Sequence, residues 1–127
     1  MKALVIPERE PVFELDLLTG SDGSRLEQLQ ATVGGIIEAV PIQYPAVTGY
    51  VHGEGKFERE LNRRATVLLS VTVPTLFTGD FVAGPLVVCG FNPARGDDPE
   101  TGGHTDLPDA MAALVWSLPG ADREILS

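Results

Sequence analysis

The sequence predicts a single α+β domain over residues 1–120, with a mostly antiparallel sheet of about four to six strands packed by two or three helices, and a frayed tail over 121–127. Three observations predict this class. The chain has 127 residues, 43% of them apolar, which suits one packed domain. Its 14 glycines and 10 prolines divide the apolar residues into short runs, as turns between strands do. Apolar residues at helical spacing occur both early and late in the chain.

The first predicted element is a β-hairpin. Residues 2–6 form a short apolar run that Pro7 ends, and residues 12–17 form a second run that partly alternates. The connection over 7–11 is short and charged, as is typical of a surface turn.

A helix and a strand meet at a pair of glycines. Ser24 and Glu27 have the spacing of a capping box, which predicts that a helix begins here. Gly34 suits the left-handed conformation that ends a helix, and Gly35 lets the chain turn back onto the sheet. The run 36–40 then alternates and predicts a strand.

The middle of the chain contains two predicted strands and one ambiguous segment. A strand is expected over 47–52, followed by a flexible glycine turn. Residues 61–73 fit a helical stripe but are rich in β-branched residues, so helix and strand both stay open. Residues 81–89 are typical of a core strand. Gly84 and Pro85 mark a bulge or an edge position there, because proline cannot donate to a ladder.

The last third of the chain combines a polar loop with a short helix. Residues 92–105 are rich in Gly, Asp and Pro, a composition typical of surface loops. Thr105 or Asp106 is the expected cap of a helix whose apolar residues continue at helical spacing to Leu118.

Charge and cysteine content argue against several classes of protein. The formal net charge of −9 disfavours nucleic-acid binding, which depends on Lys and Arg that neutralise phosphates. No run of about 18 apolar residues is present, so no membrane span is expected. The single cysteine, Cys89, cannot form an intramolecular disulfide, which favours a cytoplasmic protein. No metal or cofactor motif is present, so neither a metal nor a cofactor is expected.

One short segment concentrates positive charge. Lys56, Arg59, Arg63 and Arg64 place four of the nine cations within nine residues. Arginine binds phosphate and carboxylate groups through two parallel hydrogen bonds, so this segment could form a pocket for an anion. Two intervening glutamates leave a solvated, salt-bridged surface as the alternative.

Glu38 is the acidic residue with the least obvious structural role. It lies in the apolar run 36–40, where a carboxylate is costly unless it is paired or solvated. Three interpretations follow: Glu38 points outward at a sheet edge, pairs with Arg63 or Arg64, or belongs to a ligand site.

Five short stretches occur in an order that resembles a known family. They are MKALVIP at 1–7, VGGIIEAV at 33–40, EGK at 54–56, NRRAT at 62–66 and AGPLVV at 83–88. They are similar to an uncharacterised domain-of-unknown-function family found in actinobacteria, their phages and mobile elements of other Gram-positive bacteria. That family has no settled activity. The resemblance implies signature positions, which are Gly34, Gly35, Glu38, Glu54, Gly55, Lys56, Asn62, Arg63 and Ala65.

Together these observations favour a non-enzymatic accessory protein of a phage or mobile element that binds a host protein or a small anionic, nucleotide-like ligand in the cytoplasm. The expected binding surface comprises Glu38, Glu54, Lys56, Asn62, Arg63 and Arg64. One alternative is a DNA mimic, in which the acidic residues of 97–124 imitate phosphates in a basic protein groove. Another is a small nucleotide-processing enzyme that depends on Glu38. A homo-oligomer is left open.

Overall fold

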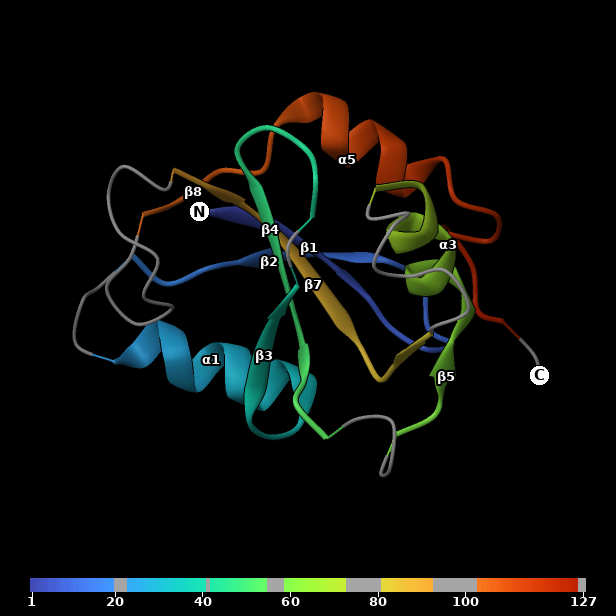
Figure 1. The fold of residues 1–127 in the computed structure, drawn as a ribbon, viewed down its shortest axis with the longest axis horizontal. Coiled ribbons are helices and arrows are strands. Elements are labelled where there is room, and N and C mark those ends of the chain that lie inside the picture. Colours follow the sequence, from blue (N-terminus) through green and yellow to red (C-terminus); the bar gives the residue numbers. More distant parts are fainter. Residues whose placement is uncertain (20–22, 41, 55–58, 73–80, 93–102, 126–127) are drawn as a thin grey trace.

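The computed structural model describes residues 1–19, 23–40, 42–54, 59–72, 81–92 and 103–125 (Figure 1). Within these ranges, three helices and an open, antiparallel sheet of six strands form one small domain. This arrangement confirms the predicted α+β class.

The central strand of the sheet is β7 (Leu86–Phe91). It is antiparallel to β1 (Lys2–Ile6) on one side and to β4 (Val47–His52) on the other. Both faces of β7 are covered, and its residues from Leu86 to Cys89 are fully buried. The strand therefore shows a continuous apolar run in place of the alternation of a half-exposed strand.

The remaining strands complete the sheet and add a small second one. They are β2 (Phe13–Asp16), β3 (Ile37–Val40), β5 (Leu61–Asn62), β6 (Val82–Ala83) and β8 (His104–Thr105). β2 forms the predicted hairpin with β1, β3 is the opposite edge beside β4, and β8 pairs with the end of β7. β5 and β6 pair only with each other among the described strands. Gly84 and Pro85 lie between β6 and β7, so they form a turn and not a bulge inside a strand.

The sheet separates two hydrophobic clusters. Helix α1 (Ser24–Val33) covers one face, while α3 (Arg63–Thr72) and α5 (Asp109–Trp116) cover the other (Figure 1). Side chains alternate along β1, so that Val5 packs in the cluster with α1 and Leu4 in the cluster with α3 and α5.

Helix α1 ends as predicted but begins differently. Gly34 has a φ of 88°, and the N–H groups of Gly34 and Gly35 both donate to the carbonyl oxygen of Gln30 at 2.9 Å. At the other end the cap residue is Gly23, also left-handed, and Ser24 is already the first helical residue. The predicted capping box with Ser24 as cap was therefore wrong. Glycine has no side chain to cap with, so the residue at the cap position makes no side-chain hydrogen bond to the helix.

The ambiguous segment is strand β5 followed directly by helix α3. Asn62, the last residue of β5, caps the helix: its Oδ1 accepts a hydrogen bond from the N–H of Ala65 at 3.0 Å. Ala65, Leu68 and Thr72 then lie buried on one face. A helical conformation costs Val and Thr only a few tenths of a kcal/mol each, so the cap and the buried face outweigh the β-branched composition.

The last helix begins later than predicted. Asp109 is its first residue and Pro108 precedes it, whereas Thr105 belongs to β8. The carboxylate of Asp106 accepts a hydrogen bond from the N–H of Lys2 at 2.7 Å. Residues 104 and 105 therefore belong to the sheet, the Asp106 side chain contacts β1, and the expected cap at Thr105 or Asp106 was wrong.

The C-terminal residues contact the connection between β1 and β2. The carbonyl of Ala121 accepts a hydrogen bond from the N–H of Val12 at 2.8 Å, and the N–H of Ile125 donates to the carbonyl of Arg9 at 2.7 Å. Ala121 is also part of the core on the α3 side. Residues 121–125, expected to be frayed, are thus attached to the domain, while 126 and 127 lie outside the described residues.

Candidate binding pocket at the start of helix α3

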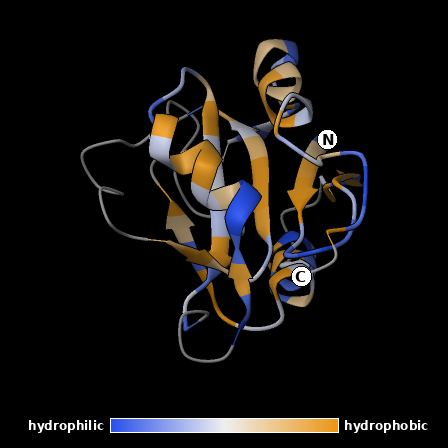
Figure 2. Ribbon diagram, turned by 90° about the vertical axis from the view of Figure 1, so that its right-hand side faces the viewer, coloured by the Kyte–Doolittle hydropathy of each residue, from blue (hydrophilic) through white to orange (hydrophobic). Residues whose placement is uncertain are grey.

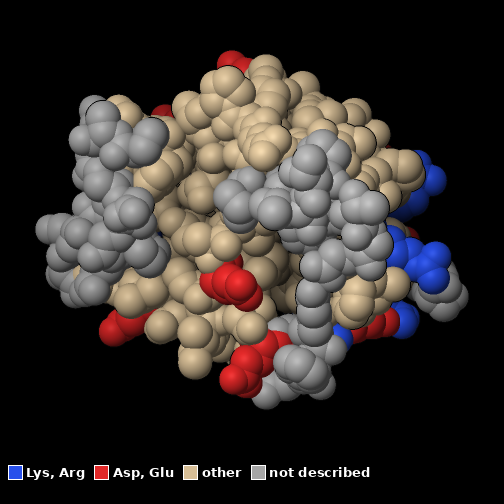
Figure 3. Space-filling model, in the orientation of Figure 1, with Lys and Arg blue, Asp and Glu red and all other residues tan. Residues whose placement is uncertain are grey.

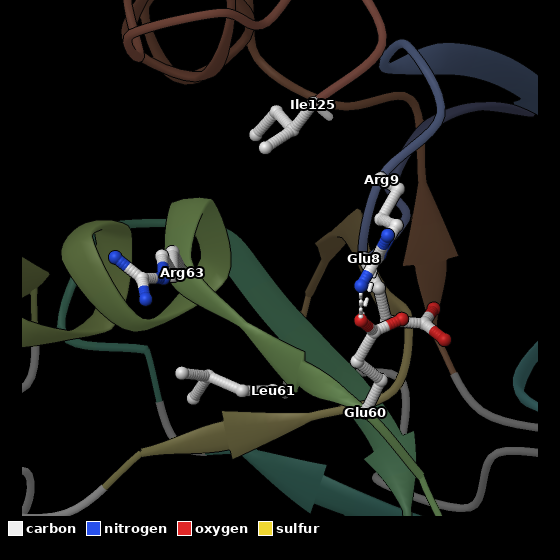
Figure 4. Close-up of a pocket in the computed structure, with 6 residues that line it drawn as sticks. All are labelled: Glu8, Arg9, Glu60, Leu61, Arg63 and Ile125. Atoms are coloured by element: carbon white, nitrogen blue, oxygen red, sulfur yellow. Dashed lines mark hydrogen bonds and ion pairs between the residues drawn. The ribbon is translucent and has the colours of Figure 1, made fainter. Parts of the chain in front are cut away.

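A pocket of about 240 Å³ lies where the β1–β2 connection meets the start of α3. The described residues that line it come from three parts of the chain, the connection, the β5–α3 junction and the C-terminus (Figure 4). They are Glu8, Arg9, Glu60, Leu61, Arg63 and Ile125. The Lys and Arg atoms visible in Figure 3 gather at the right-hand edge of the molecule in that view, where Figure 1 places α3 and the C-terminus. The pocket therefore combines charged groups with aliphatic walls in the most cationic part of this face.

Asn62 joins the elements that form the pocket. Its side chain is fully buried, and Nδ2 donates to the carbonyl of Ile6 at 2.7 Å and to the carbonyl of Gly84 at 2.9 Å. With the cap on Ala65, all the hydrogen-bonding groups of the amide are used within the fold. Asn62 thus positions the pocket without facing it.

Arg64 plays a similar role on the inner side of α3. Only 3% of the residue is exposed, and its guanidinium donates to the carbonyls of Pro7, Glu10, Gly120 and Arg123. Burial lowers the pKa of Arg64 from its ordinary value. The side chain ties α3 to both the β1–β2 connection and the C-terminal residues, and it is occupied by main-chain acceptors.

The exposed charges of the pocket divide into a pair and a single cation. Nε of Arg9 donates to Oε1 of Glu60 at 2.7 Å, a second guanidinium nitrogen donates to the same oxygen, and this hydrogen bond raises the pKa of Arg9. The guanidinium of Arg63 points away from that pair in Figure 4. Arg63 is exposed and its side chain forms no hydrogen bond or ion pair with the described residues. Among the described residues, one guanidinium of the pocket is therefore engaged and the other is not.

Arg59 lies beside this pocket and packs against two glycines, Gly34 and Gly84. Its guanidinium is 3.7 Å from the carboxylate of Glu8, and its side chain passes Gly34 and Gly84. A Cβ at Gly34 would lie 2.9 Å from Nη1 of Arg59, and one at Gly84 would lie 3.2 Å from its Cγ. Both glycines also have positive φ, so both positions favour glycine by conformation and by space.

A second pocket of about 230 Å³ adjoins Arg59. The described residues that line it are Val5, Pro7, Glu8, Glu10, Phe13, Thr32, Arg59 and Pro85. Sequence reasoning included Arg59 in the basic segment but missed Glu8 and Arg9. The charged run at 8–10, which indicated only a surface turn, was the available signal.

The other predicted site residues lie elsewhere or outside the described ranges. Glu38 is exposed on the edge strand β3 opposite Val51, which corresponds to the outward-pointing interpretation. Glu54 is exposed after β4, and its N–H donates to Nδ1 of His52 at 2.9 Å. Neither glutamate is among the described residues that line the two pockets. Lys56 and Gly55 lie outside the described residues.

A separate polar group is buried on the α1 side of the sheet. The hydroxyl of Tyr50 and Nε2 of His104 are 2.7 Å apart, and Nδ1 of His104 has no hydrogen-bond partner within the described structure. Burial, and then the charge of Arg25, lower the pKa of His104 to about 4. Burial raises the pKa of the Cys89 thiol to about 12, as expected for an unreactive core cysteine.

The described part of the chain contains neither a metal-ligand cluster nor a helix suited to a membrane. No group of three or more His, Cys, Asp or Glu side chains lies where it could hold a metal ion. No helix there has both the length and the apolar character that a membrane crossing requires.

The comparison with known proteins places the chain in a family without an assigned activity. No curated protein and no solved structure matches it. The family model "Domain of unknown function (DUF3846)" matches residues 1–116, which includes all described helices and strands. The chain therefore belongs to the DUF3846 family.

Proposed function

We propose that the protein acts by binding and that the pocket at the start of α3 receives an anionic group, either a carboxylate of a partner protein or a small anion. The observation that supports this function is the contrast between two guanidiniums. Arg9 is held by Glu60, whereas Arg63 is exposed without an ion-pair partner among the described residues. A free guanidinium offers two parallel N–H donors that match a carboxylate or phosphate.

The pocket walls favour one class of anion over another. Leu61 and Ile125 supply aliphatic surface beside the charged groups. None of the described lining residues is aromatic, so no ring is present there on which a nucleobase could stack. A carboxylate or phosphate on an aliphatic frame is therefore the better match, and a nucleotide is the weaker one. The net charge of −9 opposes general attraction of anions and makes a local, specific contact necessary.

We infer the biological setting from the family resemblance alone. The resemblance implies an origin in phages or mobile elements, and we infer from it an accessory protein that acts in the host cytoplasm on a host partner. In this proposal no catalytic step is assigned, and the pocket serves to hold the partner or ligand.

The test is a titration that observes the arginine side chains directly. The Nε–Hε NMR signals of ¹⁵N-labelled protein are followed while sodium phosphate or sodium acetate is added to about 10 mM at constant ionic strength, which covers millimolar affinity. We expect saturable shifts at Arg63 together with the backbone amides of Leu61 and Ile125.

Two matched variants decide whether the pocket is responsible. Arg63→Gln should remove the saturable response, whereas Arg123→Gln should keep it, because Arg123 is an exposed arginine that pairs with Asp122 outside the pocket. Shifts that stay linear, or that are equal in the two variants, would overturn the proposed function.

A further inference from the structure

Helix α3 carries an exposed aliphatic stripe that begins at the pocket. Val67 is 46% exposed and Val71 is 64% exposed, and they follow Arg63 at intervals of four residues. Residues four apart lie on the same side of a helix, so the three side chains form a ridge about 12 Å long. Figure 2 views this helix from outside, with a hydrophilic N-terminal end followed by hydrophobic residues.

Leu61 extends this stripe into the pocket. It is 43% exposed and lies below Arg63 in Figure 4. Packing of α3 onto the sheet uses its other face, with Ala65 and Leu68 fully buried, so the exposed valines are not needed for the core. Single exposed apolar residues are common, but a contiguous stripe next to an uncompensated cation is typical of an interaction surface.

We propose that this ridge, defined as Leu61, Arg63, Val67 and Val71, docks an amphipathic helical segment of a partner protein that carries an Asp or Glu beside aliphatic residues. The aliphatic side chains of the segment cover the two valines, and its carboxylate binds the Arg63 guanidinium. The inference rests on the proposed function and names the class of ligand that the pocket receives.

Charge complementarity selects this occupant over others. A neutral or basic apolar segment would bury the surroundings of Arg63 without compensating its charge, which costs free energy. A second copy that docks through the same ridge is a poorer match, because the ridge contains no carboxylate and the neighbouring carboxylates of Glu60 and Glu8 already face Arg9 and Arg59. An acidic residue one helical turn from aliphatic anchors satisfies both requirements.

The experiment selects binders from a display library of random helical peptides about 15 residues long, using the whole protein as bait. The Val67→Ser/Val71→Ser double variant tests the ridge, since Ser and Val have similar helix propensities and both positions are exposed. Ile36→Ser is the matched control, because Ile36 is 68% exposed but lies between α1 and β3. We expect selected peptides with an acid three or four residues from aliphatic side chains. Their affinity should fall at least about tenfold for the double variant and for Arg63→Gln, and stay unchanged for Ile36→Ser.

Several results of the selection would overturn the inference. They are selected peptides that lack an acidic residue, binding that the double variant retains, and the absence of any selected peptide. Light scattering tests whether a second copy of the protein occupies the ridge. A dimer of the wild-type protein that the double variant abolishes would show that it does, and would overturn the inference. The phosphate titration separates the two proposals. If the Arg63 signal shifts saturably with phosphate but no selected peptide depends on the two valines, the docking ridge is refuted and the proposed function stands. If the Arg63 signal shows no saturable shift, the proposed function is refuted.

Discussion

Asn62 provides the sharpest test of how the pocket is built. Its amide makes three buried hydrogen bonds, to the N–H of Ala65 and to the carbonyls of Ile6 and Gly84. In Asn62→Ala the helix loses its cap, which costs about 1 kcal/mol. Each carbonyl that loses its donor adds about 1 kcal/mol, so we expect the free energy of unfolding to fall by about 3 kcal/mol in total.

A second substitution separates the cap from the two carbonyl contacts. Asp caps helices as well as Asn does, so Asn62→Asp keeps the acceptor for Ala65. It also replaces the Nδ2 donor by a carboxylate oxygen that faces the carbonyls of Ile6 and Gly84, and it buries a charge. We therefore expect Asn62→Asp to lose at least as much stability as Asn62→Ala at pH 7.

The assay is urea unfolding followed by circular dichroism, with thermal unfolding as a check. A loss of about 3 kcal/mol should lower the Tm by roughly 10 °C or more for a domain of this size. If Asn62→Asp were within about 0.5 kcal/mol of the wild-type protein, the carbonyl contacts would contribute nothing, and the assignment of Asn62 as a positioning residue would be refuted.

Three further predictions concern Arg64, Gly35 and His104. Arg64→Met should lower the free energy of unfolding, measured by urea titration, by about 3 kcal/mol, because four carbonyls lose a charged donor. Arg63→Met, on the exposed side of the helix, should change it by less than about 0.5 kcal/mol. Equal losses in the two variants would contradict the different roles of the two arginines. Gly35→Ala should destabilise the protein by about 1–3 kcal/mol, because its Cβ would lie 2.5 Å from Nε2 of His52, and an unchanged Tm would argue against this close contact. The pKa of His104 is about 4 in the folded protein and about 6.5 when unfolded, so the unfolded chain binds the proton first and stability falls as the pH drops through this window. Between pH 7 and pH 4.5 this loss should be about 2.5 kcal/mol, and it should be absent from the pH dependence of His104→Gln in urea titrations.

Local features of the sequence were sufficient for much of the fold. The first hairpin, the left-handed end of α1 at Gly34 and the buried character of the apolar run that ends at Cys89 were all predicted, because each depends on neighbouring residues or on a continuous apolar run. The segment 61–72 could not be resolved in this way. Its β-branched residues favour a strand, and the helix is stabilised by the Asn62 cap and by burial against the sheet.

The candidate site was predictable only in part. The concentration of arginines is visible in the sequence, and one of these arginines, Arg63, lines the candidate pocket. The sequence cannot show that Arg64, the next residue, is buried against carbonyls more than 50 positions away, since adjacent helical residues point in different directions.

The sequence by itself determined the fold class, the acidic character and the location of the basic segment, because these follow from composition and short-range periodicity. Only the tertiary structure decided which charges are engaged. Glu60 neutralises Arg9, main-chain carbonyls occupy Arg64, and Arg63 alone of these three arginines keeps an exposed guanidinium without a partner among the described residues. Ion pairs and hydrogen bonds of this kind depend on distances between side chains far apart in the chain, and those distances are set by packing on the sheet.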